Sequence, residues 1–110
     1  MRFPKSLRVN GREWKVEMSP PEDMGAAAGL CHYSKALISI STGQDQFDTR
    51  DTLLHEALHA ILYQQGRLTM GNEEEEIYVR AISTGLMGVL QDNPLFAKWL
   101  IQPITSTDPS

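Results

Sequence analysis

Apolar and polar residues alternate with two different periods along this chain, first a strand period of about two and then a helical period near 3.6. In the first part, Leu7 to Val9 and Glu13 to Met18 predict two strands joined by an Asn10-Gly11 turn, the dipeptide that tight hairpins prefer. Gly29 to Tyr33 and Ala36 to Ile40 predict two more strands across a short turn. The N-terminal part is therefore expected to form a small antiparallel or mixed sheet.

The second part of the chain has the period of helices. One helix is predicted from Arg50 to Gln64, with Asp48 or Thr49 as its N-cap. A second helix is predicted from Glu73 to Gln91 and a short third one from Leu95 to Ile101. Strands followed by helices indicate an α+β domain. We expect this single domain to cover residues 1–102, followed by a mobile polar tail at residues 103–110.

The 110 residues suit one small domain, and 41% hydrophobic residues can supply its core. The net charge of −4 and the lack of a basic patch argue against a nucleic-acid partner. Cys31 is the only cysteine, so no internal disulfide can form, and a reducing compartment is expected. The sequence has no signal-peptide core and no run of 18 apolar residues, which predicts a cytoplasmic protein that does not span a membrane.

The strongest chemical signal is the segment His55-Glu56-Ala57-Leu58-His59, an H-E-x-x-H pattern inside the predicted helix. Residues four apart lie on one face of a helix, so the two imidazoles can bind one Zn²⁺ while Glu56 acts as a general base. The plain alternative is a solvated helix whose histidines have no role. Scarce histidines at this spacing favour the metal site, because exposed helix faces more often carry Lys, Glu and Gln.

The surroundings of the motif divide the helix into two stripes. Thr52 and Tyr63 share the stripe of the motif residues, so Tyr63 is a candidate to stabilise an oxyanion, although a packing role is more common for such a tyrosine. A neighbouring apolar stripe is expected to face the core; it consists of Leu54, Leu58, Ile61 and Leu62. Cys31 and His32 are adjacent in a strand, point to opposite faces and are not expected to share an ion.

A catalytic zinc ion needs a third protein ligand, and the candidates are the four glutamates Glu73 to Glu76 at the start of the next helix. Glutamates at this place also favour the helix dipole, which is the ordinary explanation for any one of them. The expected buried face of the helix is formed by Val79, Ile82, Leu86, Val89 and Leu90. Glu75 falls on the centre line of this face and Glu76 on its border, so periodicity leaves both open.

An H-E-x-x-H motif followed about one helix later by glutamate resembles the gluzincin metallopeptidases, and the layout is similar to small phage and prophage members near the ImmA/IrrE type. Counted from Glu76, the apolar or small positions of that family's ligand helix coincide with this chain, which makes Glu76 the expected ligand and Glu75 the runner-up; these positions are Val79, Ile82, Ser83, Leu86 and Met87. Arg80 departs from the pattern, because an asparagine often stands there.

This resemblance implies a minimal zincin-like domain in which His55, His59 and Glu76 bind Zn²⁺ and Glu56 is the catalytic base for peptide hydrolysis. The substrate would be a protein or peptide that adds to an edge strand formed by Leu37 to Ile40, in a bacterial host cytoplasm. One alternative is a metal-bound zincin-fold module that docks a host or phage protein without peptidase activity. Another is a structural zinc that ties two helices together, although such a site has no use for Glu56.

Overall fold

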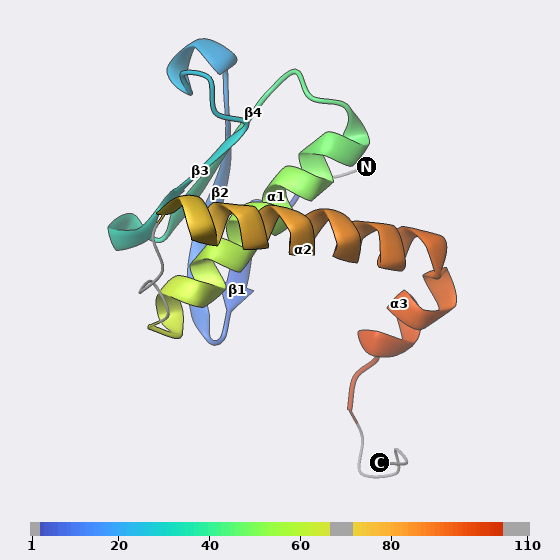
Figure 1. Ribbon diagram of the computed structural model, residues 1–110. Coiled ribbons are helices and arrows are strands. Elements are labelled where there is room, and N and C mark those ends of the chain that lie inside the picture. Colours follow the sequence, from blue (N-terminus) through green and yellow to red (C-terminus); the bar gives the residue numbers. More distant parts are fainter. Residues whose placement is uncertain (1–2, 67–71, 105–110) are drawn as a thin grey trace.

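The computed structural model describes residues 3–66 and 72–104, and within them four strands precede three helices (Figure 1). The strands are β1 (Ser6–Val9), β2 (Arg12–Ser19), β3 (Gly29–His32) and β4 (Leu37–Ser41). The helices are α1 (Gln46–Gln64), α2 (Asn72–Asp92) and α3 (Pro94–Leu100). The predicted α+β arrangement, a mixed sheet followed by the motif helix and a second long helix, is confirmed. Of the predicted tail, residues 105–110 lie outside the described part.

The strands form one sheet in the order β1-β2-β4-β3. β1 and β2 are the predicted hairpin, and both Asn10 and Gly11 have positive φ in its turn, as this type of turn requires. β2 pairs in parallel with β4, and β3 pairs antiparallel with β4 on the other side. The prediction that Leu37 to Ile40 is an edge strand is therefore wrong. From Ile38 on, the residues of β4 are buried on both faces, serines included, as in a central strand, and β3 forms the edge on this side of the sheet instead.

Helix α1 begins four residues earlier than predicted. Asp45 is the N-cap, and its Oδ1 accepts a hydrogen bond of 2.7 Å from the backbone N–H of Asp48. The predicted caps Asp48 and Thr49 therefore lie inside the first turn, where the charge of Asp48 favours the helix dipole. The helix ends before Gly66, which has a φ of +69°.

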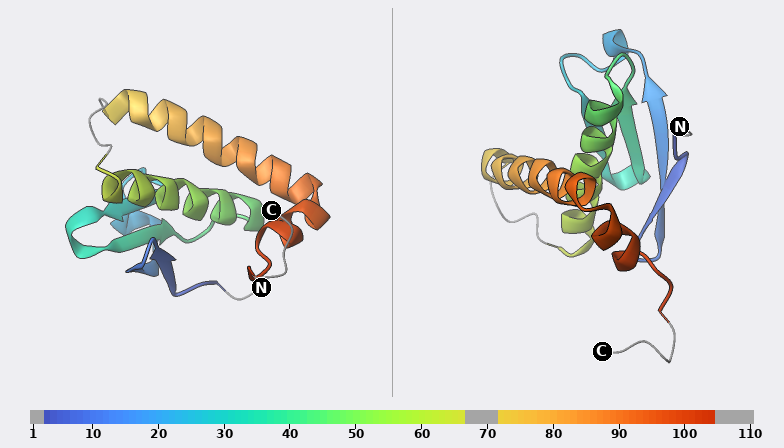
Figure 2. Two further views of the ribbon diagram at one scale, coloured as in Figure 1. Left: turned by 90° about the horizontal axis from the view of Figure 1, so that it is seen from below. Right: turned by 90° about the vertical axis from the view of Figure 1, so that its right-hand side faces the viewer.

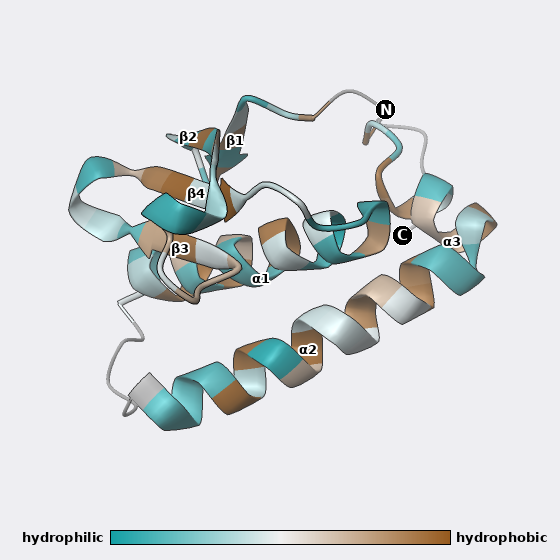
Figure 3. Cartoon of the chain, turned by 90° about the horizontal axis from the view of Figure 1, so that it is seen from above, coloured by the Kyte–Doolittle hydropathy of each residue, from teal (hydrophilic) through white to brown (hydrophobic). Residues whose placement is uncertain are grey.

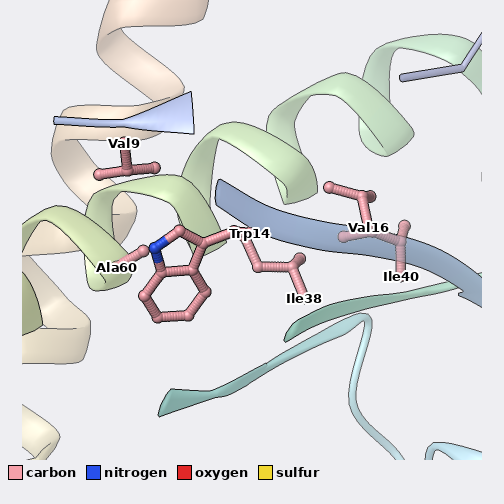
Figure 4. Packing of buried hydrophobic residues seen from close by; sticks show 6 residues of the cluster. All are labelled: Val9, Trp14, Val16, Ile38, Ile40 and Ala60. Atoms are coloured by element: carbon pink, nitrogen blue, oxygen red, sulfur yellow. The ribbon is translucent and has the colours of Figure 1, made fainter. Parts of the chain in front are cut away.

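The core lies between the sheet and α1, where Trp14 and Ile38 are fully buried (Figure 4). The six buried residues of this cluster are Val9, Trp14, Val16, Ile38, Ile40 and Ala60. Trp14 Nε1 donates a hydrogen bond to Gln64 Oε1, and Gln64 Nε2 donates one to the carbonyl oxygen of Val9. These bonds fix the last turn of α1 on the hairpin.

The apolar stripe predicted for α1 is only partly correct. Of its four members, Ile61 packs against the core cluster, whereas Leu54, Leu58 and Leu62 are half-buried elsewhere. Leu53, Ala60 and Tyr63 supply the rest of the contact. The helix is thus rotated from the expected orientation, and its smallest core residue, Ala60, meets the sheet beside Trp14. This rotation brings the motif residues closer to the sheet.

Helix α2 crosses α1 and continues beyond it to α3 (Figures 1 and 2). Its buried residues recur every four positions and include two polar ones; they are Glu75, Val79, Ser83 and Met87. Ile82 and Val89, which were predicted to be buried, are 54% and 46% exposed. The prediction is wrong here because the face of α2 that meets α1 carries Glu75 and Ser83 alongside Val79 and Met87, and the larger aliphatic side chains lie to one side of it.

Helix α3 lies at the far end of α2, away from the sheet (Figure 1). Figure 3 shows apolar segments along both α2 and α3. On α3, Trp99 is 66% exposed and stacks on Phe96 with 6.3 Å between ring centroids. None of the helices in the described residues is both long and apolar enough to cross a membrane.

Candidate metal centre

Helix α1 carries the motif into a cleft of about 770 Å³ that is bordered by β3 and the first half of α2. His55 and His59 lie one turn apart, and their Nε2 atoms are 3.3 Å from each other. Both rings are mostly buried, and burial lowers the pKa of His55, an effect that the nearby carboxylate of Glu76 opposes. A less basic imidazole keeps its lone pair available at neutral pH.

Glu76 reaches both histidines from the first turns of α2. Its Oε1 lies 2.7 Å from His55 Nε2, and its Oε2 lies 3.1 Å from His59 Nε2. Together the three residues offer ligand atoms that all lie within 4.8 Å of one another. Ligands at about 2.0–2.1 Å from a tetrahedral zinc ion are roughly 3.3–3.4 Å apart, so two nitrogens and one carboxylate at these separations suit such an ion.

Glu75 takes a different place from its neighbour. Its Oε2 lies 2.7 Å from His59 Nδ1, on the side of the ring away from Glu76. Both side chains of this pair are buried, and Glu75 Oε1 has no hydrogen-bond partner among the described residues. A carboxylate on Nδ1 fixes the ring and leaves Nε2 free to bind a metal. The two glutamates that periodicity could not separate thus contact opposite nitrogens of one histidine.

Glu56 lies inside the same cleft and is only 6% exposed. Burial raises the pKa of its carboxyl to about 7; the charge of His59 opposes this rise, and that of Glu76 adds to it. The edge strand approaches Glu56 closely at Gly29. A Cβ atom at this position would lie 3.0 Å from Glu56 Oε2 and 2.7 Å from Thr52 Cγ2. The glycine therefore allows β3 to pass directly over the carboxylate.

The tyrosine singled out from the sequence is not the one that lines the cleft. Tyr63 packs against the core cluster, with its ring edge-on to Trp14 at 6.3 Å between centroids. Tyr33, at the end of β3, stacks on Tyr63 at 4.8 Å and borders the cleft. Tyr33 was not singled out from the sequence. Its position directly after a predicted strand would have pointed to it only if that strand had been recognised as the edge of the sheet.

The neighbours of Tyr33 in β3 face different surroundings. Cys31 lines the cleft, and burial, together with the charges of Glu56 and Glu75, raises the pKa of its thiol to about 12. His32 lies 3.0 Å from Ser39 Oγ through its Nε2 atom. At the other side of the cleft, Arg80 Nη2 lies 3.4 Å from Glu76 Oε1.

A mixed sheet, an H-E-x-x-H helix and a second helix that presents glutamate to both histidines define a zincin-like domain of the metallopeptidase type. The chain belongs to the SprT-like family, whose model matches residues 4–75. The match includes the whole sheet and α1, and it ends one residue before Glu76. Neither the curated proteins nor the solved structures contain a match to this chain.

The family assignment confirms the zincin part of the resemblance. The family that matches is the SprT-like one, and the nearness to the ImmA/IrrE type stays a prediction. The phage or prophage origin, the cytoplasmic location, the lack of a nucleic-acid partner and the division at residue 102 stay predictions. So do the individual roles of His55, Glu56, His59 and Glu76.

Proposed function

We propose that this protein is a zinc-dependent peptidase that hydrolyses peptide bonds in the cleft between β3, α1 and α2. The observation that carries the proposal is the position of Glu56. A buried carboxylate lies in the same cleft as the His-His-Glu group, one residue after His55. A zinc site with a purely structural role needs no such group and fills its fourth position with a protein ligand.

His55, His59 and Glu76 would hold the ion, because their ligand atoms are close enough together and are of the types that zinc prefers. When bound, zinc would polarise the scissile carbonyl and acidify a water molecule. Glu75 would keep His59 oriented through its contact with Nδ1. The two successive glutamates would thus have different roles at the same ring. Glu75 contacts Nδ1 of His59, and Glu76 lies near its Nε2.

Glu56 would act as the general base and then the general acid. It would accept a proton from the attacking water and pass this proton to the amine that leaves. Its buried position against the backbone of Gly29 restricts the directions in which the carboxylate can turn. The base is thereby held next to the strand along which a substrate would lie.

The substrate would be an extended peptide beside β3. This strand pairs only with β4, so its other edge is unpaired among the described strands. An unpaired edge offers backbone N–H and C=O groups to an extended chain. The residues of this edge that border the cleft are Ala28, Gly29, Leu30 and Cys31. In this proposal the substrate therefore lies along β3, and not along Leu37 to Ile40 as the sequence suggested.

The test begins with the metal content of the purified protein, measured by elemental mass spectrometry without added zinc. About one zinc per chain is expected. Hydrolysis of fluorescein-labelled casein is then compared between the wild type and Glu56→Gln. The variant should keep its zinc and lose at least about a hundredfold in rate. Glu22→Gln, which changes an exposed glutamate that does not line the cleft, is the matched control.

Three results would contradict the proposal. A chain that takes up no zinc at neutral pH has no such centre. Equal hydrolysis by the wild type and Glu56→Gln would exclude Glu56 as the base. Zinc uptake with no hydrolysis of casein or of unfolded test proteins would instead support the alternative of a metal-bound module that acts by docking another protein.

A further inference from the structure

Two stacked tyrosines connect the core to the cleft. Their rings are 4.8 Å apart and inclined by 28°. Tyr63 contacts Trp14 and belongs to the packing of the core, while Tyr33 borders the cleft together with His59 and Glu75. The stack fixes the plane of the Tyr33 ring, so the direction of its hydroxyl is restricted before any ligand arrives.

The hydroxyl of Tyr33 is a free donor. No other described residue makes a hydrogen bond to it, in contrast to the two threonine hydroxyls of the cleft. Thr52 Oγ1 donates to Gln44 Oε1 at 2.9 Å, and Thr84 Oγ1 lies 3.4 Å from Asp51 Oδ2. Burial and the negative charges of the cleft raise the pKa of Tyr33, so the phenol keeps its proton at neutral pH.

Such a donor would add to the effect of the metal in peptide hydrolysis. The carbonyl oxygen of the scissile bond gains negative charge as water attacks, and a positioned N–H or O–H group stabilises it. Two other side chains in the cleft are weaker candidates. Cys31 offers only a thiol, which is a poor donor. The Arg80 side chain is 73% exposed and contacts Glu76, so its charge is largely screened by water.

We propose that the Tyr33 hydroxyl donates a hydrogen bond to the carbonyl oxygen of the scissile peptide bond as this oxygen becomes negative. Tyr33 is then a catalytic residue that comes from the short 3-10 turn after β3, whereas Glu76 comes from α2. This inference rests on the proposed peptidase function.

The experiment compares Tyr33→Phe with Tyr63→Phe, because each change removes one hydroxyl and keeps the stacked rings. Both proteins are loaded with Co²⁺, whose visible spectrum reports on ligands, and are titrated with a phosphonate analogue of an alanine dipeptide. The phosphonate oxygens imitate the charged oxygen of the transition state. Loss of a hydrogen bond to a charged group should weaken binding by about 10- to 100-fold in Tyr33→Phe. Tyr63→Phe should match the wild type within about twofold.

The outcomes separate this inference from the proposed function. Wild-type affinity for the phosphonate in Tyr33→Phe overturns the role of Tyr33, while the peptidase proposal stands. The same conclusion follows if Arg80→Gln, and not Tyr33→Phe, loses affinity, because the guanidinium is then the donor. A wild-type protein that shows no Co²⁺ spectrum at all contradicts the metal centre itself. Casein hydrolysis provides a second readout, in which kcat should fall for Tyr33→Phe and KM should stay unchanged.

Discussion

Helices α1 and α2 both contribute to the candidate metal centre, but they are held in place by different forces. α1 lies against the sheet, where Ala60 packs beside Trp14 and Ile38. α2 lies on α1 and presents a narrower face that includes the buried polar residues Glu75 and Ser83. Hydrophobic burial therefore positions one half of the site, and a polar cluster positions much of the other half. A bound metal ion would therefore contribute far more to the position of α2 than to that of α1.

The two tryptophans provide the sharpest test of this contrast. Trp14 is fully buried in the core, whereas Trp99 on α3 is 66% exposed. Replacing Trp14 with Ala should lower the free energy of unfolding by about 3–5 kcal/mol, because the change removes a large buried side chain and leaves a cavity. Trp99→Ala should change it by about 0.5 kcal/mol or less. Urea unfolding followed by circular dichroism measures both, and similar losses would contradict the division into two regions.

Metal binding should stabilise α2 more than α1. Zinc at about 100 times its dissociation constant adds roughly 2.7 kcal/mol to the stability of the form that binds it. Local unfolding that separates Glu76 from the histidines then costs this much more free energy. Local unfolding at the outer edge of the sheet keeps its rate. Hydrogen exchange with and without zinc should therefore show the largest slowing at residues 73–84. Equal slowing in β1 would indicate that the whole domain folds around the ion.

The contact between Glu75 and His59 is expected to tune the metal site without supplying a ligand. Glu75→Gln should weaken zinc binding by about 10- to 100-fold, since the charge on Nδ1 is lost while all three ligands remain. Glu74→Gln, an exposed neighbour, is the matched control. Competition with a chromogenic chelator measures both affinities. Complete loss of zinc in Glu75→Gln, with retention in Glu76→Gln, would reverse the assignment of the two glutamates.

The thiol of Cys31 is a side group of the tightly packed half of the molecule, and burial suppresses its reactivity. A thiol whose pKa is about 12 is almost wholly protonated at pH 8, and only the thiolate reacts with iodoacetamide. Alkylation of the native protein at pH 8 should therefore be at least about 100-fold slower than in urea. The rate should rise with pH up to the raised pKa. Mass spectrometry of timed samples gives the rates, and equally rapid labelling in both states would contradict the burial of this thiol.

Most of the fold could be predicted from local patterns. The Asn10-Gly11 turn and the alternation around it indicate the hairpin, and the boundaries of α2 are predicted to within a residue of Asn72 and Asp92. The order of the strands could not be predicted, since the parallel pairing of β2 with β4 depends on contacts between distant segments. For this reason Leu37 to Ile40, rather than β3, was predicted to be the edge strand.

The candidate site divides in the same way. The motif places His55, Glu56 and His59 on one face because helical spacing is a local property. The choice between Glu75 and Glu76 depends on how α2 is rotated against α1, and periodicity pointed to a buried face that includes Ile82, which is exposed. Tyr33 was missed for a related reason, since only the tertiary structure brings the end of β3 next to α2.

The residue at position 29 allows related sequences to be compared in a way that the H-E-x-x-H motif alone does not. A single added carbon there would collide with Thr52 and crowd the carboxylate of Glu56, even though no acid, base or ligand had changed. A relative with a larger residue at the equivalent place could keep every motif position and still have a base that is turned aside. Loss of the proposed activity among relatives could therefore begin on the edge strand and leave the H-E-x-x-H motif intact.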